Sequence, residues 1–451
     1  MGINMEREAY TELLEWKSKD GRKPLILNGA RQVGKTWLLK EFGSREYESL
    51  AYINCEETPE MKAAFRDFDT GRLVRYFTAL SKTAVQPGNT LIVLDEIQEV
   101  PLGLTALKYF CEEAPEYHIA VAGSLLGIGL HEGTGFPVGK VDEIDLHPLS
   151  FKEFITALGN KILAGQMGEG RWEELSGLSS TFIELLRQYY YVGGMPAVVR
   201  AYAETHDVLA VRGIQNQILA DYRRDFSKHV PADIQPKVNM VWDSVPAQLA
   251  KENKKYVYSA VKKGGRAKEF ENAIQWLQDA GLVHKVRRVS KLARPLKFYE
   301  DYDSFKLYAL DLGLLGAMAD VPAKDVLVTG TALVEYKGAF TEQYVLQELR
   351  AEGFRPYYYS KENSSLEIDF AVQMDDGLYP IEVKAEENLR SKSLRTVYEA
   401  DNTLRPCRFS MSGYKEQDWM VNIPLYLARE WMRQRQEETS DRITKLFRQL
   451  D

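Results

Sequence analysis

The sequence has no long hydrophobic run. Its longest apolar stretches, such as Thr90–Leu94 and Ile119–Leu130, fall well short of the roughly 20 residues that a membrane-spanning helix needs. The start, MGINMEREAY, carries acidic side chains where a signal peptide has an apolar core, and Glu6 stands where a myristoylation signal has Ser or Thr. We therefore expect no membrane segment and no targeting peptide, and we expect the protein in the cytoplasm.

Cysteine and histidine are scarce. Cys55, Cys111 and Cys407 are too scattered for a disulfide framework or a tetrahedral zinc site, and no Cys-x-x-Cys pair occurs. The six histidines form no His-x-x-x-His pair, which argues against a histidine-based metal site. We expect free thiols in a reducing compartment.

The composition is that of an ordinary globular protein. The 451 residues are 45% hydrophobic and 27% charged, and this length predicts two to four domains. The net charge of −7 conceals a locally basic segment. Residues 251–300 carry thirteen Lys or Arg against five Asp or Glu, a balance of +8. We therefore expect an electrostatic contact with an acidic partner in this segment.

The pattern along the chain predicts four regions. Short runs that are apolar on both faces alternate with helix-forming segments in residues 1–150, which is typical of a parallel α/β sheet. The expected strands are 24–30, 50–56, 90–96 and 118–124, and the expected helices are 35–42, 61–81 and 104–113. Residues 151–240 have helical spacing and predict a lid or linker. Residues 241–330 read as helices followed by a β-ribbon, which suggests a winged helix, and residues 331–451 read α-β-β-β-α-β.

A phosphate-binding motif follows the first expected strand. The eight residues from Gly29 to Thr36 fit Gly-x4-Gly-Lys-Ser/Thr. In this motif glycines let backbone N–H groups approach phosphate oxygens, and the following helix adds its positive N-terminus. We expect Lys35 to reach the β- and γ-phosphates and Thr36 to bind Mg²⁺. The expected nucleotide-binding residues are Gly29, Ala30, Arg31, Gln32, Val33, Gly34, Lys35, Thr36 and Trp37. The alternative is a glycine-rich turn without a ligand.

Two acids end the third expected strand. Leu91–Leu94 precede Asp95 and Glu96, so a buried strand would deliver both carboxylates beside the phosphate loop. We expect Asp95 to hold Mg²⁺ through water and Glu96 to orient or deprotonate the attacking water. Ser124, at the end of the fourth strand, is expected to contact the γ-phosphate or the water. The alternatives are a solvated acidic pair and a plain strand end.

These segments resemble a known family. LILNGARQVGKTWLL, TLIVLDEIQE, AVAGSLLG and LHPLSFKEF, with YYYVGGMPAVV and IEVKAEENLRSKSL further on, are similar to AAA-type ATPases that end in the domain of unknown function DUF4143. The resemblance implies a P-loop ATPase domain, a winged helix and a nuclease-like end domain, with ATP and Mg²⁺ as ligands. Many relatives carry Arg in the FPVGKV region, where this chain has Lys140. A lysine can neutralise γ-phosphate charge but lacks the bidentate fork of arginine.

The end domain follows the spacing of the PD-(D/E)xK nucleases. Asp369 is followed after twelve residues by Glu382-Val383-Lys384, and Glu342 lies on the preceding expected helix. Period-two geometry projects Glu382 and Lys384 from one face of their strand. We expect Asp369, Glu382 and Glu342 to hold Mg²⁺ against a scissile phosphate and Lys384 to position water. The alternative is a solvated strand edge with no site.

The basic segment gives a candidate DNA contact. Its cations within residues 262–297 lie where a winged helix faces the groove and backbone of DNA. Winged helices also dock proteins, so two hypotheses stand. One is an ATP hydrolase whose nucleotide state controls a DNA-directed nuclease. The other is an ATP-dependent switch whose end domain only recognises DNA or a protein partner. A phosphotransferase is a third possibility, which Glu96 argues against.

Overall fold

The computed structural model describes residues 5–100, 102–123, 135–251, 254–327, 337–361, 364–385 and 391–447. The chain forms two compact units. The amino-terminal unit contains Glu6–Pro148 and Gln275–Leu282, and the carboxy-terminal unit contains Met1–Met5, Leu149–Ile274 and Val283–Asp451. Within the described ranges, no helix combines the length and the apolar character needed to cross a bilayer. The domain limits expected at 150, 240 and 330 stay predictions.

The amino-terminal unit is built on a five-stranded sheet in the order β2-β3-β4-β1-β5, and all its neighbouring strands are parallel. The strands are β1 (Leu25–Asn28), β2 (Ser49–Asn54), β3 (Thr90–Asp95), β4 (His118–Ala122) and β5 (Asp142–Asp145). The first four were expected from the sequence. The fifth was not, because the segment DEID is short and has three acidic residues and a single apolar one.

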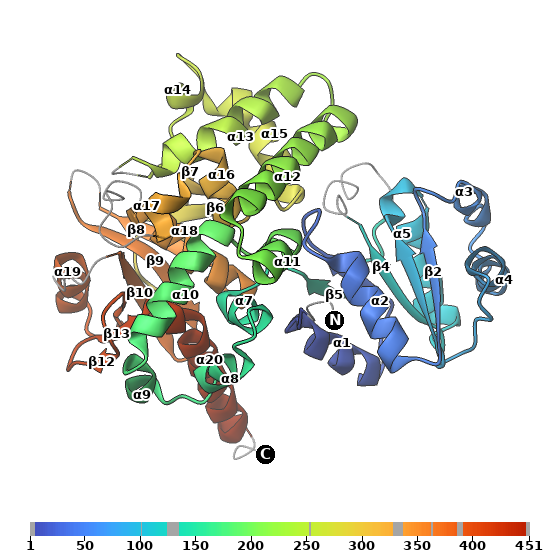
Figure 1. Cartoon of the computed structure of the whole chain (residues 1–451), viewed down its shortest axis with the longest axis horizontal. Coiled ribbons are helices and arrows are strands. Elements are labelled where there is room, and N and C mark those ends of the chain that lie inside the picture. Colours follow the sequence, from blue (N-terminus) through green and yellow to red (C-terminus); the bar gives the residue numbers. More distant parts are fainter. Residues whose placement is uncertain are drawn as a thin grey trace. The chain divides into compact units, whose positions relative to one another are not determined.

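Helices cover both faces of this sheet. They are α1 (Ala9–Ser18), α2 (Lys35–Glu46), α3 (Glu60–Ala64), α4 (Thr70–Ser81) and α5 (Gly103–Glu113), with a 3-10 turn η1 (Ile97–Glu99). Figure 1 shows α1 and α2 on one side and α3, α4 and α5 on the other. The single helix expected over 61–81 is two helices, because Asp69 caps α4 by accepting a hydrogen bond from the backbone N–H of Arg72.

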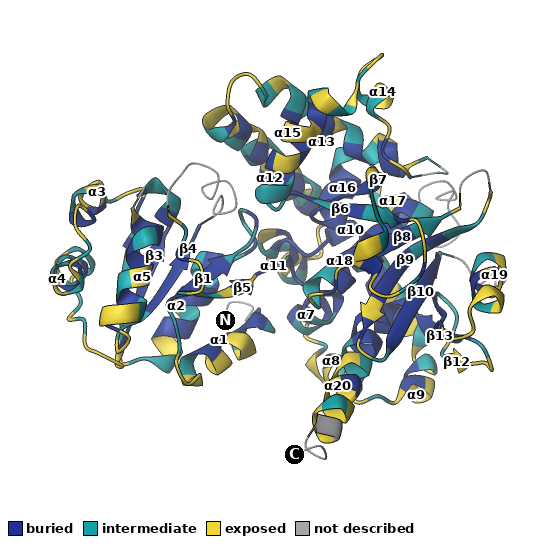
Figure 2. Cartoon of the chain, turned by 180° about the vertical axis from the view of Figure 1, so that it is seen from behind, coloured by how far each residue is buried: buried dark blue, intermediate teal, exposed yellow. Residues whose placement is uncertain are grey.

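The carboxy-terminal unit begins with helices, as expected. α7 starts with a capping box in which Ser150 and Glu153 bond each other's backbone N–H groups. The helices up to the ribbon are α7 (Phe151–Ala157), α8 (Lys161–Met167), α9 (Trp172–Ser176), α10 (Ser179–Val192), α11 (Pro196–Thr205), α12 (Val208–His229), α13 (Gln235–Leu249), α14 (Tyr258–Val261) and α15 (Ala267–Asp279). Figure 2 shows buried inner faces and exposed outer faces on many of these helices.

An eight-stranded mixed sheet follows, in the order β12-β13-β11-β10-β9-β8-β6-β7. Its strands are β6 (Val283–Val289), β7 (Glu300–Ala309), β8 (Tyr357–Ser360), β9 (Glu367–Met374), β10 (Gly377–Lys384), β11 (Cys407–Ser410), β12 (Lys415–Glu416) and β13 (Val421–Pro424). The ribbon β6–β7 is part of this sheet, because β6 pairs with β8 in parallel. The expected winged-helix ribbon and the end domain therefore share one sheet.

Both faces of the mixed sheet are covered. The remaining elements are η2 (Leu296–Tyr299), α16 (Leu312–Met318), α17 (Ala323–Leu327), α18 (Lys337–Ala351), α19 (Lys392–Ala400), η3 (Leu425–Leu427) and α20 (Ala428–Phe447). On one face, Leu394 and Val397 of α19 pack with Ile368, Ala371 and Leu378 in a buried cluster. The buried helix α18 lies on the other face, where Glu342 bonds to Tyr308 of β7.

Candidate functional site

The phosphate-binding motif forms a loop between β1 and α2. Gly34 precedes the helix with φ of 100°, a conformation that glycine adopts at no steric cost. Gly29 has φ of 145°, and a Cβ there would lie 2.4 Å from the carbonyl oxygen of Leu146. The loop therefore requires glycine at both positions, which leaves its backbone open to a ligand. This is the conformation that the spacing of the motif predicts.

Lys35 is buried at the first turn of α2. Its Nζ donates hydrogen bonds to the carbonyl oxygens of Gly29 and Ala30, each at 2.8 Å, so the ammonium group lies within the loop itself. Burial lowers its pKa to about 8, although the nearby carboxylates of Glu96 and Asp95 act in the opposite direction. A partly desolvated cation inside a loop of backbone groups can attract and hold an anion.

Thr36 and Asp95 meet beside this loop. The Thr36 hydroxyl donates to Oδ2 of Asp95 at 2.7 Å, and the Tyr52 hydroxyl donates to the same oxygen at 2.9 Å. Because β1, β2 and β3 are parallel, their carboxyl ends share one edge of the sheet, and this edge brings the three residues together. A hydroxyl and a carboxylate in contact are oxygen ligands of the kind that Mg²⁺ prefers.

Glu96 follows Asp95 with a left-handed backbone at φ of 50°. Its Oε2 accepts a hydrogen bond from Nε2 of Gln98 at 2.5 Å. Gln98 was not predicted from the sequence. Its contact with Glu96 depends on the turn after β3, for which the sequence gives no pattern.

A second unpredicted residue is Arg7, which is buried. Its guanidinium donates to the carbonyl oxygens of Val33 at 2.9 Å and of His147 at 2.6 Å. Arg7 therefore fixes the backbone of the phosphate loop to the segment after β5. No motif marks Arg7, and only the tertiary structure reveals this contact.

Two further predicted residues are Ser124 and Lys140. Ser124 lies outside the described residues. Lys140 lies just before β5. The first residue of β5, Asp142, pairs with Leu25, the first residue of β1, whereas the phosphate loop follows the last residue of β1. Nζ of Lys140 forms an ion pair with Glu112 at 2.8 Å. Within one chain, Lys140 therefore lies at the opposite edge of the sheet from the phosphate loop.

The predicted carboxylates of the mixed sheet fall into two groups. The first is centred on Glu342 of α18, whose Oε1 pairs with Lys254 at 2.5 Å and whose Oε2 lies 3.5 Å from Nζ of Lys306. Burial opposes ionisation of Glu342, but Lys306 and Lys254 outweigh it and hold its pKa below the usual value. Asp369 belongs to this group, since burial and the charge of Glu342 raise its pKa to about 7.

The second group contains Glu382 and Lys384. Their ion pair at 3.1 Å places both on one face of β10, in agreement with the predicted alternation. Glu382 pairs in register with Arg408 of β11, whose guanidinium donates to the hydroxyl of Ser391 beside α19. This group therefore lies on the α19 face of the sheet.

A β-bulge lies in the strand that carries Asp369. The pairing of β8 and β9 shifts register between Tyr357 and Tyr359, so that Ile368 and Ala371 of β9 both enter the cluster on the α19 face. The carboxylate of Asp369 accepts a hydrogen bond from the N–H of Val383 at 2.8 Å, next to Glu382 on β10, and the charge of Glu342 also acts on it. Among the described residues, no three acidic, histidine or cysteine side chains form a group that could hold a metal ion. The expected cluster of Glu342, Asp369 and Glu382 is thus not assembled.

Comparison with protein families agrees with this architecture. Residues 21–155 match the family described as an AAA domain, and residues 337–426 match the domain of unknown function DUF4143. The chain therefore carries an AAA domain and a DUF4143 domain. Residues 183–325 match a further domain of unknown function, DUF8612. A search of curated proteins found no match.

Solved structures show weaker likeness. The Walker-type ATPase PABY2304 of Pyrococcus abyssi is 14% identical, with 70% of this chain and 96% of that chain covered and a TM-score of 0.44. The Aeropyrum pernix ORC1 protein in complex with DNA is 14% identical over 71% and 94% of the two chains, with a TM-score of 0.31. The Thermotoga maritima RuvB branch migration motor is 13% identical over 62% and 89%, with a TM-score of 0.29. TM-scores this low support no inference about activity.

The basic segment lies partly on the ribbon. Arg287 and Arg288 of β6 are ion-paired with Glu300 and Asp301 at 3.3 and 2.7 Å. Lys291, Arg294 and Lys297, in the connection between β6 and β7, are exposed. Arg287 and Arg288 are therefore neutralised, whereas the cations of the connection face solvent.

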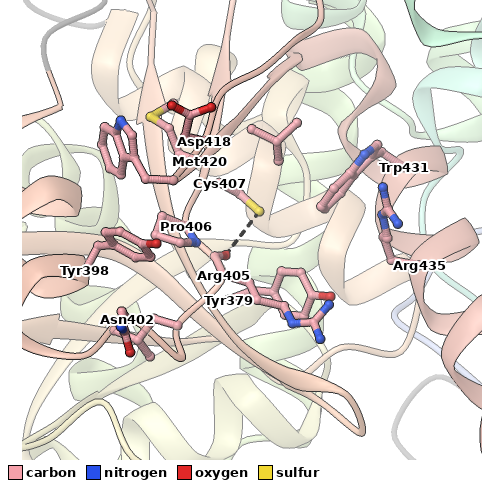
Figure 3. Close-up of a pocket in the computed structure, with 13 residues that line it drawn as sticks. Tyr379, Tyr398, Asn402, Arg405, Pro406, Cys407, Asp418, Met420, Trp431 and Arg435 are labelled. Atoms are coloured by element: carbon pink, nitrogen blue, oxygen red, sulfur yellow. Dashed lines mark hydrogen bonds between the residues drawn. The ribbon is translucent and has the colours of Figure 1, made fainter.

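A cavity of about 320 Å³ lies beside the DUF4143 sheet, away from both acidic groups. Figure 3 shows Tyr398 and Asn402 on one side, Trp431 and Arg435 on the other, and Cys407 between them. The Arg435 guanidinium lies 5.2 Å from the centre of the Trp431 ring. Aromatic faces flanked by an arginine can hold a planar ring, and this cavity was not predicted from the sequence.

Proposed function

We propose that the AAA domain binds ATP with Mg²⁺ and hydrolyses it, and that the nucleotide state controls a DNA contact of the carboxy-terminal unit. The observation that carries this proposal is the convergence of Lys35, Thr36, Asp95 and Glu96 at one edge of the sheet. Lys35 would exchange its two carbonyl oxygens for phosphate oxygens. Such a cation inside a backbone loop is a binding site for a triphosphate.

The donor set supports a magnesium ion as well. Thr36 and Asp95 provide a hydroxyl and a carboxylate oxygen in mutual contact, and Mg²⁺ commonly takes one or two protein oxygens beside phosphate and water. Bound Mg²⁺ supplies positive charge against the charge that develops on the phosphoryl group. Tyr52 donates to Asp95 and so fixes the direction of its carboxylate. Glu96 would accept the proton of the attacking water, or orient that water, once it is free of Gln98.

The carboxy-terminal unit favours recognition over cleavage. Two lysines already neutralise Glu342, and among the described residues Glu342, Asp369 and Glu382 do not form a group that could hold a metal ion. A two-metal or one-metal nuclease needs these carboxylates around one phosphate. We therefore propose that the DUF4143 domain recognises its target without cutting it, and that the exposed cations of the basic segment contact DNA. Lys140 would act, if at all, on the nucleotide of a neighbouring copy.

Phosphate release tests the first part of this proposal. Purified wild type with Mg²⁺ and ATP should release free phosphate, Lys35→Ala should not, and added DNA should change the rate. A wild type that releases no phosphate, or that transfers it to an acceptor, contradicts the proposal.

A nicking assay tests the second part. Plasmid and single-stranded DNA should stay intact with Mg²⁺ and ATP in wild type and in Lys384→Ala alike. Cleavage by the wild type that disappears in Lys384→Ala would restore the nuclease hypothesis.

A further inference from the structure

Two exposed aromatic side chains lie in the connection between β6 and β7 and at the start of β7. We call residues 290–302 the wing segment. Phe298 is 82% exposed and Tyr302 is 68% exposed. Other large hydrophobic side chains that are exposed in the described ranges are aliphatic, so both exposed aromatic ones lie in this one segment. Single exposed hydrophobic residues are common, but two exposed aromatic side chains in one short segment indicate a contact surface.

The same segment carries several cations. Lys291, Arg294 and Lys297 of the wing segment are exposed, and Arg294 donates to the backbone carbonyl of Asp375. Within the described residues, neither Arg294 nor Lys297 has an ion pair with a carboxylate, so their charge is available to a polyanion. The guanidinium of Arg287 lies 4.6 Å from the centre of the Tyr302 ring.

The acidic groups of the same segment are mostly neutralised. Glu300 is paired with Arg287 at 3.3 Å and with Arg355 at 3.5 Å, and Asp301 is paired with Arg288 at 2.7 Å. Asp303 is exposed and remains as a negative charge next to Tyr302. The wing segment therefore presents a net positive surface with two ring faces in it.

We propose that the wing segment binds single-stranded DNA, with unpaired bases stacked on Phe298 and Tyr302 and phosphates held by Lys291, Arg294 and Lys297. Every base has a ring face that can stack on an aromatic side chain, and cations beside it follow the backbone. In duplex DNA the ring faces of the bases already stack on neighbouring base pairs, so they are not available to Phe298 and Tyr302. Lysine is depleted in protein interfaces, which makes a protein partner a poorer fit. This inference rests on the DNA contact proposed above and specifies its strand state.

Fluorescence anisotropy of the full chain tests the inference. The probes are a labelled oligothymidylate of about 20 nucleotides, longer than the site of one small binding domain, and a blunt duplex of equal length. Wild type should bind the single strand more tightly than the duplex. Phe298→Ala and Tyr302→Ala should each weaken single-strand binding about tenfold, the effect of losing one stacked base.

Matched variants separate stacking from other causes. Phe298→Trp keeps a ring and should retain binding. Ile162→Ala removes a side chain that is 83% exposed on α8, outside the wing segment, and should change nothing. Lys297→Ala should reduce the slope of affinity against salt by about 0.7, the value for one phosphate contact in a single strand.

The possible outcomes separate a failure of the wing inference from a failure of the DNA contact proposed above. If wild type binds duplex at least as tightly as single strand, or if Phe298→Ala binds the single strand like wild type, the wing inference is wrong while the DNA contact stands. If wild type binds neither probe, both are wrong, and the ATP hydrolysis proposal is unaffected.

Discussion

The hydroxyl of Thr36 lies 2.7 Å from Oδ2 of Asp95, although the two residues are 59 positions apart. This contact places two oxygen ligands, a hydroxyl and a carboxylate, side by side next to the phosphate loop. Thr36→Val removes the hydroxyl at similar volume and should lower ATP turnover on the order of tenfold to hundredfold, as the loss of groups around a metal does. Thr36→Ser keeps the hydroxyl and should stay near wild type. Equal turnover in both variants, measured as phosphate release against Mg²⁺ concentration, contradicts a role for this hydroxyl.

The pKa of Lys35 predicts a pH dependence of ATP binding. Burial lowers this pKa to about 8 in the free protein, so above that pH the side chain loses its proton. An incoming triphosphate stabilises the protonated form and raises the pKa again, so binding above about pH 8 takes up a proton. Affinity should be highest below about pH 8 and fall by up to tenfold per pH unit above it.

Calorimetric titration with ATP in two buffers of different protonation enthalpy measures this proton uptake. Lys35→Arg keeps its positive charge over this pH range, so its ATP affinity should change less with pH. An affinity of the wild type that is constant between about pH 7 and 9 would show that Lys35 does not titrate on binding.

The hydrogen bonds of Arg7 predict that removing its side chain lowers the unfolding free energy. Arg7→Ala leaves the carbonyl oxygens of Val33 and His147 without their donor, which should cost about 1–3 kcal/mol of unfolding free energy. ATP affinity should fall too, because the loop loses its link to the segment after β5. Arg75→Ala, an exposed arginine of α4, is the matched control and should leave both quantities unchanged. Thermal melts and ATP titrations of the two variants check this, and unchanged affinity in Arg7→Ala refutes the positioning role.

The raised pKa of Asp369 predicts that the stability of the DUF4143 domain depends on pH. Its pKa is raised by burial and by Glu342 from 3.8 to about 7 in the folded protein. The folded state therefore binds more protons than the unfolded state between these values, so stability falls as pH rises toward 7. Asp369→Asn stays neutral and keeps an oxygen for the N–H of Val383. In EDTA its Tm should exceed that of wild type by more near pH 8 than near pH 5, because the destabilisation by Asp369 begins above its unfolded pKa of 3.8 and grows up to about pH 7. A Tm difference that is the same at both pH values contradicts this assignment.

The nucleotide site could be predicted largely from the sequence because its geometry is local or set by the sheet. The motif from Gly29 to Thr36 fixes one loop, and strands that are parallel must end at one edge, which brings Asp95 to Thr36. Arg7, Tyr52 and Gln98 could not be predicted, because their contacts depend on tertiary packing and no spacing marks them.

The carboxy-terminal site was predicted less well, for a definite reason. Strand alternation correctly placed Glu382 and Lys384 on one face. The strand of Asp369 contains a bulge, and Lys254 and Lys306, from outside the DUF4143 match, form ion pairs with Glu342. A pattern of period two contains no information about a bulge or about cations supplied by distant segments.

The most direct test of the account compares wild type with Glu96→Gln in the same samples for ATP binding and for phosphate release. Glu96→Gln keeps the shape of the side chain but cannot accept a proton. We predict that it binds ATP as tightly as wild type and releases phosphate at least about a hundredfold more slowly, the lower range for the loss of a general base. Phosphate release at the rate of wild type would contradict hydrolysis at this site.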